Sequence, residues 1–114
     1  MGGFVIHGDK SKKVLIRGIG PALTKYSVPG VLADPKLSLF SGSKVIAENN
    51  DWSADATKAT ALRAAFAATG AFTLDDKAKD AALLVELAPG DYTMWLESND
   101  GTDGVALLEV YEVP

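Results

Sequence analysis

The most informative part of the sequence is residues 81–113, AALLVELAPGDYTMWLESNDGTDGVALLEVYEV, in which three apolar runs alternate with two turn clusters. The runs cover residues 81–87, 91–98 and 105–113, and Gly, Pro, Asn and Asp are frequent in the turns between them. Short apolar runs bounded by such residues are typical of strands joined by hairpins. We therefore predict a three-stranded antiparallel meander, against which the rest of the chain packs.

Earlier parts of the chain carry the same kind of pattern. Further strands are predicted at residues 3–7, 12–18, 37–40 and 44–48, with a short edge strand at 70–74. The spacing predicts one hairpin over residues 3–18 and a second over residues 37–48, where Gly42 marks the turn. Residues 27–36 contain two prolines and a glycine, and are predicted to form a loop that crosses from one sheet to another.

An alanine-rich segment predicts the one convincing helix, over residues 55–68. Ser53 or Asp55 can cap its start by accepting backbone N–H bonds, and Gly70 suits the position just after its end. The apolar side chains that share one face of this helix are Ala59, Leu62 and Phe66. We expect that face to cover an open end or edge of the β-structure.

Together these elements predict a mainly β protein: a jelly-roll-like antiparallel β-sandwich of about seven strands with one short α-helix. Its 114 residues suit a single domain, residues 1–114, and 47% of them are hydrophobic. The net charge of −4 argues against nucleic-acid binding, and the absence of cysteine excludes disulfides. The first residues do not resemble a signal peptide, and no apolar run approaches the ~20 residues that span a membrane.

Catalytic patterns are missing from the sequence. His7 is the single histidine, there is no cysteine, and no serine lies within a Gly-x-Ser-x-Gly motif. The same composition excludes the usual zinc sites. We therefore predict that the chain is not an enzyme and needs no organic cofactor.

Two loops crowd oxygen-bearing side chains into a few residues. The candidate metal ligands are Asn49 and Asp51 in the first loop, and Asn99, Asp100 and Asp103 in the second. Calcium takes six to eight such oxygen ligands, so it is the candidate ion for these loops. The alternative is that Asn and Asp stand there because they form turns.

Three aromatic residues, Trp52, Trp95 and Tyr92, form a candidate platform for stacking on sugar rings. Tyr92 and Trp95 fall on opposite faces of the strand at residues 91–98, because successive side chains alternate. One of these faces is expected to be exposed unless the helix covers it. The alternative is that the aromatic side chains pack in the core or against the helix.

Arg17 and Glu109 each interrupt an otherwise apolar strand. A charged side chain that points inward requires a partner. We predict that Arg17 forms a structural ion pair with a carboxylate, for which Glu109 and Asp34 are the candidates.

Several motifs taken in order resemble a repeated module of large exported bacterial proteins. They are KKVLIRGIGPAL, GVLADPKLSLFSGSKVIAENNDW, GAFTL followed by KDAALLVELAPGDYT, and GTDGVALLEVYEV, and the resemblance covers residues 3–113. The second half is also similar to the β-sandwich of the bacterial pre-peptidase C-terminal domain. The resemblance implies an accessory or structural module of a secreted or cell-surface protein, with no catalytic residues to carry over.

The start of the chain adds a hypothesis about assembly. In such modules a further strand often precedes the segment that corresponds to GGFVI, whereas this chain starts at Met1-Gly2-Gly3. A missing strand would leave a sheet edge unpaired, and a neighbouring copy could then supply the partner strand. The expected function is therefore a non-catalytic structural or interaction module that binds neighbouring copies or domains. The alternative is a carbohydrate-binding module, stabilised by calcium, that binds polysaccharide through the aromatic side chains.

Overall fold

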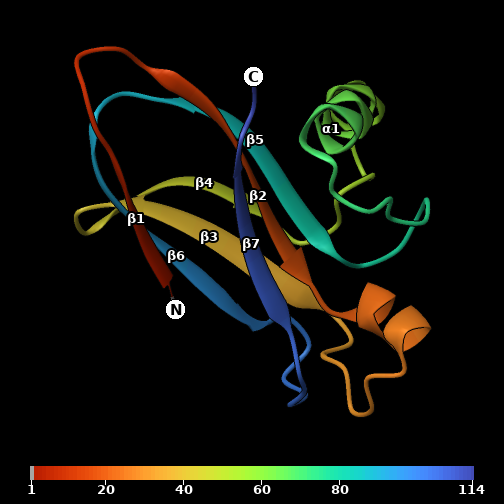
Figure 1. Cartoon of the computed structure of the whole chain (residues 1–114). Coiled ribbons are helices and arrows are strands. Elements are labelled where there is room, and N and C mark those ends of the chain that lie inside the picture. Colours follow the sequence, from red (N-terminus) through yellow and green to blue (C-terminus); the bar gives the residue numbers. More distant parts are fainter. Residues whose placement is uncertain (1) are drawn as a thin grey trace.

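The computed structural model describes residues 2–114 as a two-sheet β-sandwich with one α-helix, which confirms the predicted fold class (Figure 1). Sheet A has the strand order β1-β6-β3-β4, and sheet B has the order β5-β2-β7. The strands of sheet A are β1 (Gly2–Ile6), β6 (Gly90–Ser98), β3 (Pro35–Ser41) and β4 (Lys44–Asn49). Those of sheet B are β5 (Ala81–Leu87), β2 (Lys12–Ile19) and β7 (Leu107–Glu112).

The pairing of the strands corrects two predictions. Residues 81–113 do not form a meander, because β5 and β7 both pair with β2 in sheet B, whereas β6 lies in sheet A. Residues 3–18 do not form a hairpin either, because β1 pairs with β6. Side-chain alternation identifies the two faces of a strand but not its partner, so each connection that crosses between the sheets was mistaken for a hairpin turn.

Other predictions about the strands have mixed outcomes. The hairpin of β3 and β4 is formed, with a register shift between Leu39 and Phe40. The loop at residues 27–36 leads from sheet B to sheet A, as predicted. The predicted edge strand at residues 70–74 is wrong, because this segment has no strand pairing and instead runs beside the helix, with Leu74 buried in its core cluster.

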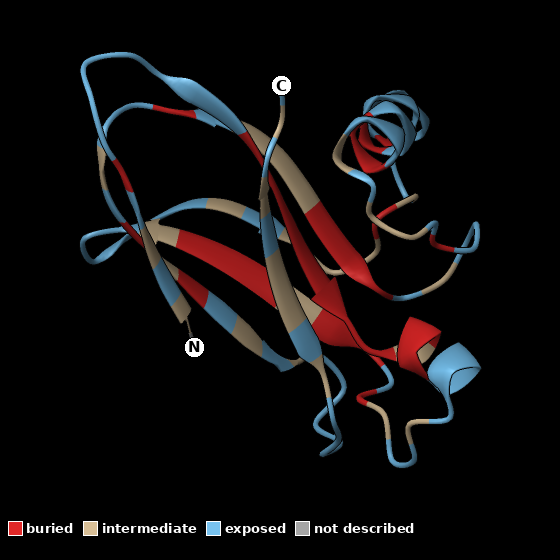
Figure 2. Cartoon of the chain, viewed as in Figure 1, coloured by how far each residue is buried: buried red, intermediate tan, exposed pale blue. Residues whose placement is uncertain are grey.

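The space between the two sheets is filled by one apolar cluster. Its buried side chains come from both sheets and are Ile6, Val14, Ile16, Leu37, Leu39, Ala81, Leu87, Tyr92 and Met94. β2 is the central strand of sheet B, and from Val14 to Ile19 it is buried on both faces, which explains its apolar run at residues 14–16 (Figure 2). A third layer therefore has to cover the other face of sheet B.

That layer is the helix α1 (Ala56–Thr69) together with the loops that flank it. The carboxylate of Asp55 caps α1 by accepting bonds from the backbone N–H groups of Thr57 and Lys58, and Gly70 ends it with a φ of 76°. The buried helix residues are Ala59, Leu62, Ala65 and Phe66, which include the predicted face. The helix covers the outer face of sheet B, so the molecule has three layers.

A buried carboxylate fixes the connection between β2 and β3. Oδ1 of Asp80 accepts hydrogen bonds from the backbone N–H groups of Gly20 at 2.7 Å and Ala22 at 3.1 Å, at the start of the 3₁₀ helix Pro21–Tyr26. Asp80 is fully buried. A side chain at Gly20 would collide with the carbonyl oxygen of Leu32, so this close approach of two backbone segments requires glycine.

Candidate functional site

The outer face of sheet A is exposed, in contrast to the outer face of sheet B, which α1 covers (Figures 1 and 2). Tyr92 and Met94 of β6 point into the core, so the alternate residues of that strand point outward. The apolar side chains of this outer face are Val5, Phe40, Val45 and Trp95, and the polar ones are Lys36, Ser38, Glu48, Asp91, Thr93 and Glu97. Four strands thus present a mixed apolar and polar surface.

Trp95 is the largest exposed side chain on this face, with 47% of its surface accessible. Its direct neighbour on β3 is Ser38, which is buried and donates a hydrogen bond to Oε2 of Glu48 at 3.3 Å. Nζ of Lys36 lies 3.2 Å from the same carboxylate oxygen. The tryptophan ring therefore lies beside a small network of charged and hydroxyl groups, as suits a binding surface with an apolar centre and a polar surround.

The predicted platform of three aromatic side chains is not formed, because two of them are buried. Trp52 is only 1% exposed, and its indole Nε1 donates to the carbonyl oxygen of Asp75 at 3.0 Å. Tyr92 is 9% exposed, and its hydroxyl donates to the carbonyl oxygen of Ala88 at 2.6 Å. Both side chains are part of the core, so Trp95 is the one of the three that is exposed and could stack on a sugar ring.

The first oxygen-rich loop is held by hydrogen bonds to its surroundings. Nδ2 of Asn49 donates to the carbonyl oxygen of Asp51 at 3.2 Å, and Oδ1 of Asn49 accepts from the backbone N–H of Ala82 at 3.1 Å. Asn49 therefore links the end of β4 to the start of β5 through a hydrogen bond. Its two amide atoms are both engaged in this structural role.

The second loop is held in a similar way. Asn99 donates its backbone N–H to the carbonyl oxygen of Asp34 at 2.8 Å and its Nδ2 to Oδ2 of Asp34 at 3.1 Å. Oδ1 of Asp100 accepts from the hydroxyl and the backbone N–H of Thr102 and from the hydroxyl of Ser98. These bonds, above all the one from the Thr102 hydroxyl, lower the pKa of Asp100 from 3.8 to about 2.

The two loops leave sheet A on opposite sides of β3, at the ends of β4 and β6. Asp103 is exposed, and within residues 2–114 no group of three acidic, histidine or cysteine side chains converges as metal ligands would. Turn formation explains the hydrogen bonds of both loops. Calcium stays the candidate ion for these loops, and turn formation stays the alternative.

Arg17 forms an ion pair with Glu109, one of the two candidate partners, across neighbouring strands of sheet B. Nη1 of Arg17 also donates to the carbonyl oxygen of Phe72 at 2.5 Å, and its guanidinium carbon lies 4.4 Å from the centre of the Phe72 ring. The hydroxyl of Tyr111 donates to Oε2 of Glu109 at 2.7 Å. Burial and, next, this hydrogen bond raise the pKa of Tyr111. The cluster holds β2, β7 and the helix layer together.

Sequence reasoning missed part of the exposed surface. Phe40, Val45 and Val5 were assigned to strands without being recognised as sharing one outer face with Trp95, because that common face depends on the strand order of sheet A. His7 is exposed just after β1 and no salt bridge is found for it in the described chain. Across the same residues, no helix has both the length and the apolar character to cross a membrane.

Comparisons with known proteins add no relative. No protein-family model, no curated protein and no solved structure matches this chain. The functional argument therefore depends on the surface of the molecule itself.

Proposed function

We propose that this chain is a non-catalytic interaction module of an exported bacterial protein, which binds neighbouring copies or domains of that protein. The exposed outer face of sheet A is the observation that supports this proposal most strongly. Trp95, Val5 and Val45 are each more than 40% exposed there and lie on three different strands. Exposed apolar side chains gathered on one face and surrounded by polar groups are typical of protein interaction sites.

The edges of sheet A support the same proposal. β1 pairs with β6 on one side, and its other side has no partner strand among residues 2–114. β4 is the opposite edge and pairs with β3 alone. Unpaired edges are templates for strand addition from another chain, and so a neighbouring copy has both a face and an edge to bind.

Self-association of the isolated chain tests the proposal. We expect sedimentation equilibrium to show concentration-dependent association of the wild-type chain, and a Trp95→Glu substitution to weaken it. Trp95 is half exposed and makes no hydrogen bond that the fold needs, so the substitution tests the surface without removing a core residue. A matched control is Tyr26→Glu, which changes another exposed aromatic residue, outside sheet A.

A second candidate function is polysaccharide binding, which the exposure of Trp95 favours. An indole ring has a broad apolar face with a polar N–H at its edge, so it can stack on a sugar ring while neighbouring polar groups bind hydroxyls. Lys36, Ser38 and Glu48 lie next to Trp95 and supply such groups. Retention of the chain on insoluble cellulose or chitin, lost in Trp95→Ala, would favour this function. Self-association without retention would favour the first.

A further inference from the structure

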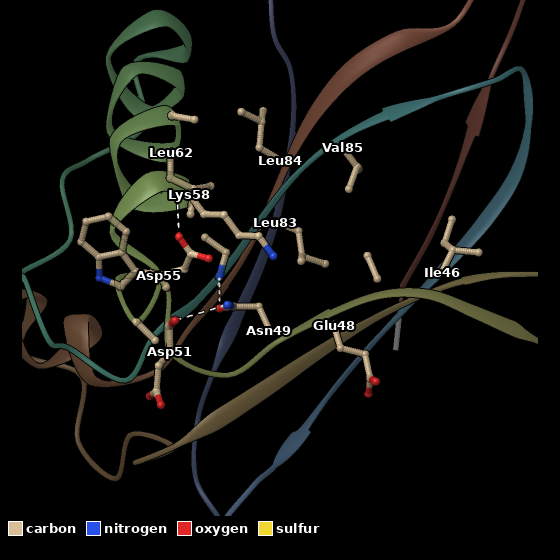
Figure 3. Close-up of a pocket in the computed structure, with 15 residues that line it drawn as sticks. Ile46, Glu48, Asn49, Asp51, Asp55, Lys58, Leu62, Leu83, Leu84 and Val85 are labelled. Carbon is tan, nitrogen blue, oxygen red and sulfur yellow. Dashed lines mark hydrogen bonds between the residues drawn. The ribbon is translucent and has the colours of Figure 1, made fainter.

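A groove of about 430 Å³ opens between β4, β5 and α1 (Figure 3). One wall consists of Ile46 and Ala47 of β4, and the opposite wall consists of Ala61 and Leu62 of α1. Its floor is the strand β5, from Ala82 to Val85. The groove lies beside sheet B and shares one lining residue, Glu48, with the outer face of sheet A, but it does not include Trp95.

The floor of the groove is an unpaired strand edge. β5 pairs only with β2, and the backbone N–H of Ala82 points away from β2, because it donates to Oδ1 of Asn49. In an antiparallel pair, the residues whose N–H and C=O groups point toward the partner alternate with residues whose groups point away. Leu84 and Glu86 therefore direct their N–H and C=O groups toward the free edge, as Ala82 does. Among the described residues, no other element satisfies the free-edge groups of Leu84 and Glu86.

The position of this edge selects the kind of partner. β4 on one side and α1 on the other flank the edge, so it is recessed between two walls. The edge strand of another folded sheet carries its own neighbouring layers and is too bulky to enter. A single extended peptide segment can enter, and its side chains would alternate between the β4 wall and the α1 wall.

Four charged residues line the groove, and three of them are the carboxylates Glu48, Asp51 and Asp55. Glu48 is already paired with Lys36, and Asp55 is engaged as the cap of α1. Lys58 is the one cation of this lining. Figure 3 shows the side chain of Lys58 extending from α1 across the groove toward Leu83. Lys58 has no salt bridge within residues 2–114. An acidic side chain of a bound segment would pair with it, and because Lys58 is exposed, added salt would weaken this pairing.

We propose that this groove binds an extended peptide segment, in which a short apolar run lies next to an acidic residue. The segment joins the three-stranded sheet B as a fourth strand at β5 by pairing with Leu84 and Glu86. This proposal goes beyond the proposed function, because it needs neither Trp95 nor self-association of the chain. It assigns the molecule a second binding surface, on the opposite sheet, for a flexible partner.

A fluorescence polarisation assay with the wild-type chain at low concentration tests the pairing directly. The probe is a fluorescein-labelled eight-residue peptide that starts with aspartate and continues with valine and threonine. The control is the same peptide with N-methyl groups on alternate residues, which removes backbone donors and keeps the side chains. We expect the control to bind about tenfold more weakly, the effect of losing one or two hydrogen bonds. Equal binding of both peptides, or no binding of either, would overturn the proposal.

Substitutions locate the bound peptide. Leu84→Pro removes an N–H group that points to the free edge and spares the bonds from β5 to β2, so we expect loss of binding without loss of the fold. Lys58→Glu is expected to weaken binding about tenfold by replacing an attraction with a repulsion. The matched control is Lys10→Glu, in the exposed turn after β1, which leaves binding unchanged. If Lys10→Glu and Lys58→Glu weaken binding equally, the peptide is not in the groove.

Discussion

Nε of Arg17 lies 2.9 Å from Oε1 of Glu109, and the two residues are direct neighbours on β2 and β7. Arg17 is completely buried, and the side chain of Glu109 is 15% exposed. The guanidinium group also contacts the rings of Phe66 and Phe72, 4.8 and 4.4 Å from its central carbon. A charge at this depth stabilises the fold only while its partners are present.

Removal of one partner should therefore be costly. We predict that Arg17→Met lowers the free energy of unfolding by about 3 kcal/mol, because Glu109 is left largely buried without its cation. The double variant Arg17→Met/Glu109→Leu should recover part of this loss, because no charge is left unpaired. Urea unfolding of the three proteins measures both effects. A single variant as stable as the wild type would show that the pair does not stabilise the fold.

Asp80 gives a second prediction about stability. Asp80→Ala leaves the backbone N–H groups of Gly20 and Ala22 buried without acceptors, so we expect a loss of about 2 kcal/mol. Asp80→Asn is the matched control, because its amide oxygen can still accept both bonds. Chemical denaturation compares the two variants. If both lose the same stability, the negative charge of Asp80, rather than its acceptor atoms, is what matters.

The low pKa of Asp100 predicts a weak acid dependence of stability. Its pKa falls from 3.8 to about 2 in the folded chain, so its carboxylate favours the folded state above pH 3.8. That contribution is lost as the pH falls from 3.8 through about 2. We expect NMR titration to place the midpoint of Asp100 near 2, and Thr102→Ala to move it toward 3.8. A midpoint near 3.8 in the wild type would mean that the Thr102 bonds do not persist in solution.

The two oxygen-rich loops predict the response to calcium. Asn49, Asn99 and Asp100 already use side-chain atoms in hydrogen bonds within and between the loops and strands. We therefore expect the thermal midpoint to be the same in millimolar calcium and in chelator. An ion that binds only the folded chain would raise the midpoint, and a clear rise would show that these loops rearrange to form a calcium site.

Much of the local structure could be predicted from the sequence. The helix was predictable because Asp55, Gly70 and the spacing of its apolar residues all indicate the same element. The strands were predictable because their apolar runs end at Gly, Pro, Asn and Asp. The partner of Arg17 was predictable because a buried cation in an apolar strand needs a carboxylate, and Glu109 interrupts another apolar strand.

Strand order and the surface were much harder to predict. Nothing in the alternation of β6 indicates that it pairs with β1 and β3 instead of β5 and β7. The neighbours of Trp95 depend on that order, as does the recessed edge of β5. Trp52 was a candidate for stacking on sugar rings, but it is buried, and its ring packs on Phe66 at 5.3 Å.

The central claim is that the outer face of sheet A binds neighbouring copies or domains, and sedimentation equilibrium tests it most directly. The chain should be measured up to about 1 mM, the effective concentration that a short linker gives adjacent modules. We predict reversible association of the wild-type chain and a monomer for the Val45→Glu/Trp95→Glu double variant, with both proteins equally stable to heat. A wild-type chain that stays strictly monomeric at that concentration would contradict the claim.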